Sequence, residues 1–259
     1  MSFSLMADIP KFLEQVHLVP LRSALANEML LLRWLHLVFG VIWIGLLYFF
    51  NLVLTPAMKA CDPKLRVRIY PELMPRAMAW FRWSALITVL VGLRYFTIYL
   101  KDDAKSENAP PGLAWKWFGE WLLVWLVAYA LIYALQLPAK GTLLDRAWVR
   151  VTGIALVTFG ACWVAMAFNE SPTSSSAHLA IAAGGGLGLV MLLNTWGIVW
   201  RAQKRLIAWT RAANEQGAPM PPEAEYMMRW TFLAARTGLW LSFPMLFLMA
   251  AASHYPMFA

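Results

Sequence analysis

The sequence predicts an all-α, polytopic membrane protein: a bundle of about six transmembrane helices with both termini outside. The first observation is composition. Of 259 residues, 61% are hydrophobic and 14% are charged, whereas soluble domains have roughly 45–50% apolar and about 25% charged residues. The second is a series of apolar runs close to the ~20 residues that a spanning helix needs. The third is an uneven distribution of Lys and Arg among the loops, which predicts orientation.

The elements follow in order along the chain. Residues 1–29 mix polar and apolar side chains and contain two prolines, so we expect an outer N-terminal segment of interfacial helices. Residues 30–256 form the predicted transmembrane domain. Loops at 56–79, 101–117 and 201–229 separate apolar runs, because Pro and charged residues concentrate there. The six expected spans are 30–54, 80–100, 118–137, 148–168, 177–200 and 230–252.

The basic residues predict which side each loop faces. Fourteen of the 22 lie in or beside the loops that follow the first, third and fifth spans, and six lie on the other side. Since Lys and Arg concentrate on cytoplasmic loops, we expect a multi-pass protein of a bacterial inner membrane, N-out and C-out. The net charge of +8 then reflects orientation in the lipid bilayer, and nucleic-acid binding is not expected.

Cysteine usage and the N-terminal residues exclude some classes of protein. Cys61 falls in a polar loop and Cys162 inside an apolar run, so no disulfide between them is expected. The pattern C-x-x-C-H is absent from the sequence, which argues against covalent c-type haem attachment. The first residues lack a basic stretch followed by an apolar one, so they do not predict a cleaved signal peptide.

All four histidines fall on the predicted outer side. His36 lies just inside the outer edge of the first span, His178 at the outer start of the fifth, and His254 at the outer end of the sixth. Ionisable residues within spans are costly and usually functional, so His36 is the strongest candidate. For His178 and His254, helix capping or headgroup binding is the alternative. His17, in the N-terminal segment, is given no special role.

Small and aromatic residues accompany the histidines. Gly40 and Trp43 lie four and seven residues after His36, on the same face of the helix. Gly185 lies seven residues after His178, within a glycine run. Glycine lets either a flat ligand or a second helix approach the backbone closely. Cofactor binding and helix packing are therefore both open for these positions.

Further polar groups lie within the spans. Arg94, in the second span, needs an anionic partner: a haem propionate, an anionic substrate, or Glu120. A simple Arg–Glu pair or snorkelling toward the interface is the alternative. A second polar set lies near the predicted inner face, and there we favour structural hydrogen bonding over catalysis: Asn51, Arg82, Asn194, Trp200 and Arg236.

The histidine pattern points to a metal or haem centre. Neutral imidazole is a good axial ligand of haem iron, and the same rings can bind copper. We therefore expect haem b, with His36, His178 and His254 as candidate ligands of its iron or of another metal. Acid-rich cages for calcium, the nucleophile elbow of hydrolases and the interrupted repeats of transporters are not visible in the sequence.

Four ordered segments, RWLHLVFGVIWIGLLYFFNLVLTP, MPRAMAWFRWSALITVLVGLRYF, LGLVMLLNTWGIVWRAQKRLI and ARTGLWLSFPMLFLMAAASHYP, span most of residues 30–256. They resemble the membrane domain of bacterial membrane-bound urate hydroxylases, the urate oxidase N-terminal domain. The resemblance implies an oxidoreductase of purine metabolism that hydroxylates urate and passes electrons to cytochrome c. It carries over motif positions without catalytic roles: His36, Trp43, Asn194, Trp196 and His254. The C-terminal cytochrome c domain of typical members is not present in this sequence.

Our hypothesis from the sequence is a membrane-embedded oxidoreductase or electron-transfer domain. It holds haem b near the outer face and is coupled to cytochrome c or another periplasmic electron acceptor. His36 is the first candidate ligand, His178 or His254 the second, and Arg94 meets a propionate. Two alternatives stay open. One is a non-catalytic integral-membrane subunit of a larger respiratory or photosynthetic complex; the other is a copper-handling membrane protein.

Overall fold

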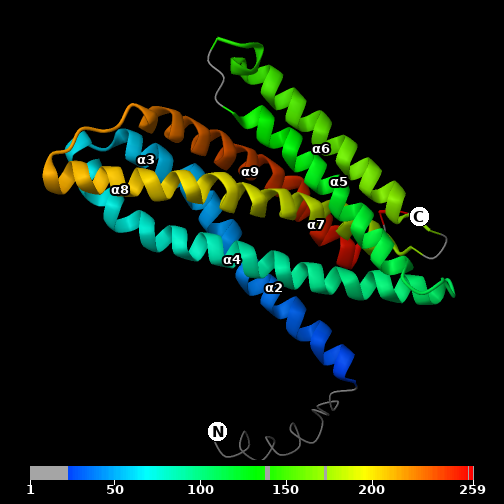
Figure 1. Ribbon diagram of the computed structural model, residues 1–259. Coiled ribbons are helices and arrows are strands. Elements are labelled where there is room, and N and C mark those ends of the chain that lie inside the picture. Colours follow the sequence, from blue (N-terminus) through cyan, green and yellow to red (C-terminus); the bar gives the residue numbers. More distant parts are fainter. Residues whose placement is uncertain (1–22, 138–140, 172–173, 256, 259) are drawn as a thin grey trace, which may run out of the picture.

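The computed structural model describes residues 23–137, 141–171, 174–255 and 257–258, and this part of the chain is an all-α bundle (Figure 1). Within it, six helices are long and apolar enough to cross a membrane, which confirms the predicted all-α class and the number of candidate spans. Most of the predicted N-terminal segment, including His17, lies outside the described residues. The helical stretches are Ala24–Ala60, Pro63–Ser106, Leu113–Gln136, Ala147–Asn169, Ser176–Gln216 and Glu223–Ala252.

Two of these stretches change helical type on the way. A π-helical turn interrupts the first and another interrupts the fifth, and each is followed by a further α-helix. The elements are α2 (Ala24–Tyr48), η1 (Phe49–Leu54, π), α3 (Thr55–Ala60), α4 (Pro63–Ser106), α5 (Leu113–Gln136), η2 (Leu143–Asp145, 3₁₀), α6 (Ala147–Asn169), α7 (Ser176–Asn194), η3 (Thr195–Val199, π), α8 (Trp200–Gln216) and α9 (Glu223–His254).

The predicted loops at 56–79 and 201–229 are largely helical in the structure. α4 begins at Pro63, where Asp62 Oδ1 accepts hydrogen bonds from the backbone N–H groups of Lys64 (2.8 Å) and Leu65 (3.3 Å). An Asp N-cap followed by Pro is a strong helix start. Polar composition marks where a helix leaves the apolar layer, but its backbone hydrogen bonds continue in water. The loop predictions took the edge of the apolar layer for the end of the helix.

α4 is the longest element and it contains two prolines. Its 44 residues correspond to about 66 Å at 1.5 Å per residue, about twice the thickness of a hydrocarbon core. Pro75 has no N–H to donate to the carbonyl of Pro71 four residues earlier. The Arg211 guanidinium of α8 donates to that carbonyl oxygen at 3.4 Å. Arg211 therefore supplies a hydrogen bond at the point where the backbone hydrogen bonds of α4 are interrupted.

α7 is the central helix of the bundle. In its most apolar window 72% of residues are buried, against 11% in α6. Trp121 and Trp125 of α5 both donate their indole N–H to the Ala182 carbonyl of α7, at 2.7 and 3.2 Å. A Cβ at Gly186 would lie 1.7 Å from the Trp125 ring. The glycine run after His178 therefore serves helix packing, the second of the two alternatives.

The bundle has two ends, which we name by their contents (Figure 1). The terminal end holds the start of α2, the α4–α5 and α6–α7 connections and the end of α9. The basic end holds the α3–α4, α5–α6 and α8–α9 connections. Large apolar side chains on the outward face of α6, such as Trp148, Phe159 and Trp163, are at least 65% exposed. Such a surface is suited to lipid.

Candidate functional site

His36 is wedged between α2 and α4. Its Nδ1 lies 2.9 Å from the backbone carbonyl oxygen of Thr88. A carbonyl only accepts, so Nδ1 carries the proton and Nε2 is the unprotonated nitrogen of the neutral ring. Nε2 makes no hydrogen bond to the described residues. Gly92 permits this approach, because a Cβ there would lie 2.9 Å from His36 Cε1.

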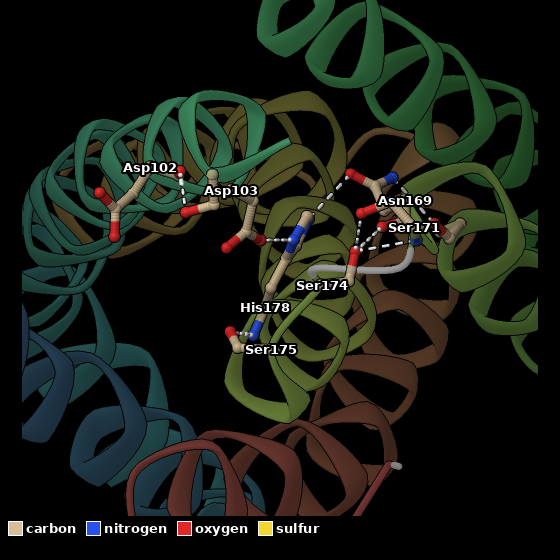
Figure 2. A network of polar contacts seen from close by, with 9 residues as sticks. Asp102, Asp103, Asn169, Ser171, Ser174, Ser175 and His178 are labelled. Carbon is tan, nitrogen blue, oxygen red and sulfur yellow. Dashed lines mark hydrogen bonds and ion pairs between the residues drawn. The ribbon is translucent and has the colours of Figure 1, made fainter. Parts of the chain in front are cut away.

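His178 lies in a buried polar network at the terminal end (Figure 2). Its Nδ1 pairs with the Asp103 carboxylate of α4, and its Nε2 lies 3.2 Å from Asn169 Oδ1. The amide orientation is set by a bond of 2.9 Å from Asn169 Nδ2 to the Ala165 carbonyl. Both partners of the ring therefore accept, and both ring nitrogens donate. The side chain is 0% exposed.

The surroundings of His178 hold it rigidly. Ser175 Oγ accepts from the His178 backbone N–H at 3.1 Å and caps α7. The rings of Phe96 and Trp117 pack on the imidazole, with centroids 5.6 and 6.3 Å away. With both nitrogens engaged, this ring is an anchor joining α4, α6 and α7. Sequence reasoning missed its partners; the available signal was an Asp and an Asn at the ends of spans that meet at one end of the bundle.

The remaining predicted ligands lie elsewhere. His254 is at the exposed end of α9. Arg94 pairs with Glu28 of α2 through two bonds of 2.6 and 2.9 Å, and Glu120 lies 3.8 Å from Lys116. Arg94 thus makes the simple Arg–Glu pair that was the alternative from the sequence, but its partner is Glu28 and not Glu120. Across the described ranges, no three His, Cys, Asp or Glu side chains gather to form a metal-binding group.

Gly40 and Trp43 do not share one environment. Gly40 faces α4, where a Cβ would lie 3.7 Å from Thr88 Cγ2, an ordinary contact. Trp43 is 2% exposed, and its indole N–H has no hydrogen-bond partner in the described part of the chain. It lines a chamber that no sequence pattern predicted.

This central chamber has a volume of about 580 Å³. Its walls come from α2 with η1 and α3, from α4, from α7 with η3 and α8, and from α9. It runs from mid-height of the bundle toward the basic end, since it is lined by Trp43 and Gly238 at one extreme and by Lys59 and Arg66 at the other. Six methionines line it: Met58, Met74, Met78, Met191, Met220 and Met228. The size and apolar lining are those of a small-molecule site.

Several polar atoms of the chamber have no partner among the described residues. They are Trp43 Nε1, Arg66 Nε, Thr231 Oγ1 and both side-chain atoms of Asn194. Both π-helical turns also line the chamber, through Phe50, Asn51 and Leu54 of η1 and through Thr195 and Val199 of η3. Single π turns occur frequently at functional sites.

The second polar set behaves in two ways. Asn51 Nδ2 donates to the Leu47 carbonyl at 2.9 Å. The Arg82 guanidinium lies 3.8 Å from the Trp200 ring centroid, and the Arg82 carbonyl accepts from Trp196 Nε1 at 3.0 Å. The Asn51 bond is of the structural kind favoured from the sequence, whereas the Arg82 side chain is held by the Trp200 ring and its Nε has no partner among the described residues. The Asn194 side chain makes no hydrogen bond to the residues that the structure describes.

Comparison of the chain with protein-family models, curated proteins and solved structures found no match.

Proposed function

We propose that the protein is a membrane-embedded oxidoreductase or electron-transfer domain that binds a b-type haem through His36, near the terminal end of the bundle. The supporting observation is the 2.9 Å contact between His36 Nδ1 and the Thr88 carbonyl oxygen. A metal-ligating histidine typically donates its other ring N–H to a carbonyl or carboxylate, which fixes the tautomer and orients the ring. His36 has this arrangement, with Nε2 left as the donor for iron.

The other candidate ligands fit haem to different degrees. His178 does not fit while its two nitrogens bond Asp103 and Asn169. His254 is exposed and its ring is accessible. A haem would therefore be held by His36, with His254 as the candidate second ligand. Arg94 would meet a propionate only by giving up Glu28. When bound, haem iron supplies one-electron chemistry.

The chain's own residues position such a group and its partner. Thr88 orients the His36 ring, and Gly92 leaves room for it against α4. The distribution of basic residues favours an outward-facing terminal end. A periplasmic cytochrome c would then reach this end without an electron crossing the bilayer. Urate hydroxylation, which the four resembling segments imply, is the substrate reaction that we propose.

The test is a reduced-minus-oxidised spectrum of the purified full chain, read at the α band of b-type haem. His36→Ala is expected to lose most of the haem retained by the wild type. Thr88→Ala is the matched control, since it keeps the carbonyl that His36 uses and should retain haem. A preparation without haem by spectrum and pyridine assay would contradict the proposal. Full retention in His36→Ala would remove His36 as ligand.

A non-catalytic integral-membrane subunit is the second candidate. It is favoured by the internal pairing of two of the polar groups expected to bind a cofactor, His178 and Arg94. A haem-free preparation that stays with a larger complex in gentle detergent would support this role. Metal analysis of the same preparation tests the copper-handling alternative.

A further inference from the structure

The central chamber contains a buried amide with no partner. Asn194 is 2% exposed, and neither its Nδ2 nor its Oδ1 makes a hydrogen bond within the described residues. Buried polar groups in native proteins are nearly always paired, and an unpaired one calls for a ligand or water. Trp43, also 2% exposed, lines the same chamber, and its indole N–H has no partner within the described residues. Two residues from different helices, both of which line the chamber, therefore each carry a buried polar group without a partner in the described part of the chain.

The chemistry of the lining indicates what that partner carries. Trp43 Nε1 and Arg66 Nε can only donate, and the Asn194 amide can both donate and accept. None of the residues that line the chamber is an Asp or Glu. The complement of this donor-rich set is a molecule with oxygen acceptors. The methionine-rich walls are adaptable and apolar, so the rest of that molecule is apolar too.

The positions of Trp43 and Asn194 indicate that the polar group of the bound molecule is neutral. Asn194 lies two residues before Trp196, which bonds Arg82 at mid-height of α4. Trp43 lies between Gly40, which faces Thr88, and Leu47, which faces Gly238 of α9. The cations that line the chamber are Lys59 and Arg66, at the basic end, whereas Arg82 at mid-height is not one of the lining residues. Burial of a carboxylate where no cation lines the chamber is costly, whereas a ketone oxygen needs only hydrogen bonds.

We propose that the central chamber binds a lipid-soluble molecule of the quinone class, whose carbonyl oxygens accept hydrogen bonds from Asn194 and Trp43. The ring and its apolar substituents lie along the methionine-lined walls. This site is separate from the proposed haem ligand His36, which does not line the chamber. The π turns η1 and η3 widen the two helices where they border it. The protein thus contains a second small-molecule site, toward its basic end.

The test measures binding of ubiquinone-1 to the purified full chain in detergent, by calorimetry or equilibrium dialysis against empty micelles. Asn194→Leu keeps the side-chain size and removes the amide, and Trp43→Phe removes only the indole N–H donor and part of the ring. Each variant is expected to weaken binding at least tenfold. Removing an unpaired buried amide does not lower stability, so Asn194→Leu should keep the wild-type melting temperature and haem content. Trp43→Phe should lower the melting temperature, because the smaller ring leaves a void in the core.

Gln136→Leu is the matched control. Gln136 is another buried amide without a partner, 0% exposed, but it lies on α5 and outside the chamber. This variant should bind ubiquinone-1 like the wild type. Equal binding by Asn194→Leu and wild type would overturn the proposal, as would no binding above empty micelles. So would tight binding of oleate that depends on Arg66 and Lys59 and excludes ubiquinone-1, because the occupant would then be an anionic amphiphile.

Discussion

Gly186→Ala should destabilise the bundle strongly, because the chain leaves no space there. A Cβ at this position would lie 1.7, 2.0 and 2.2 Å from three atoms of the Trp125 indole, which is 0% exposed. Carbon atoms in contact are about 3.5–4.0 Å apart, so the ring or the helix must retreat by about 2 Å. Overpacking costs about 1–3 kcal/mol, and the bond from Trp125 Nε1 to Ala182 adds about 0.5–1.5 kcal/mol.

The expected loss is therefore about 2–4 kcal/mol in the free energy of unfolding. It is measured by titration of the detergent-solubilised protein with SDS, followed by circular dichroism. Gly188→Ala is the matched control on the same helix, since a Cβ there meets nothing within 4 Å. It should be neutral or gain up to about 1 kcal/mol. Equal stability of the two variants would refute the packing argument, as would an undiminished Gly186→Ala penalty after Trp125→Leu.

Two further variants probe polar contacts, with melting temperature in detergent as the measurement. Asp103→Asn removes the carboxylate that faces a buried imidazole with two donating nitrogens and should lower the free energy of unfolding by about 3–5 kcal/mol. The control Asp102→Asn changes an exposed neighbour and should cost little. Similar losses of stability in the two variants would contradict the assignment of Asp103 as the partner of His178. Arg211→Met leaves the Pro71 carbonyl without its bond and should lower the free energy of unfolding by about 1 kcal/mol. The cost should be smaller in a Pro75→Ala background, where the alanine supplies a backbone N–H. An equal cost with Pro75 and with Pro75→Ala would exclude a role of Arg211 in supporting the Pro71 carbonyl.

The three histidines predicted to share one depth show how far sequence reasoning reached. Hydropathy identified His36 as an ionisable group near the end of an apolar run and grouped it with His178 and His254 by depth. Depth is a one-dimensional property, so it could not specify that His36 bonds Thr88 or that His178 bonds Asp103 and Asn169. Those pairings depend on how each helix is rotated about its axis, and that rotation is set by contacts with other helices.

The composition and length of the apolar runs determined the fold class and the six helices, because hydrophobicity and helix length are local properties of the chain. Helix ends were less accessible: Asp62 and Pro63 start α4 well before its apolar part. Only the tertiary structure decided that Trp43 and Asn194 line one chamber. They are 151 positions apart in the sequence, and the space between them exists only where side chains of α2, α4, α7 and α9 fail to fill the bundle.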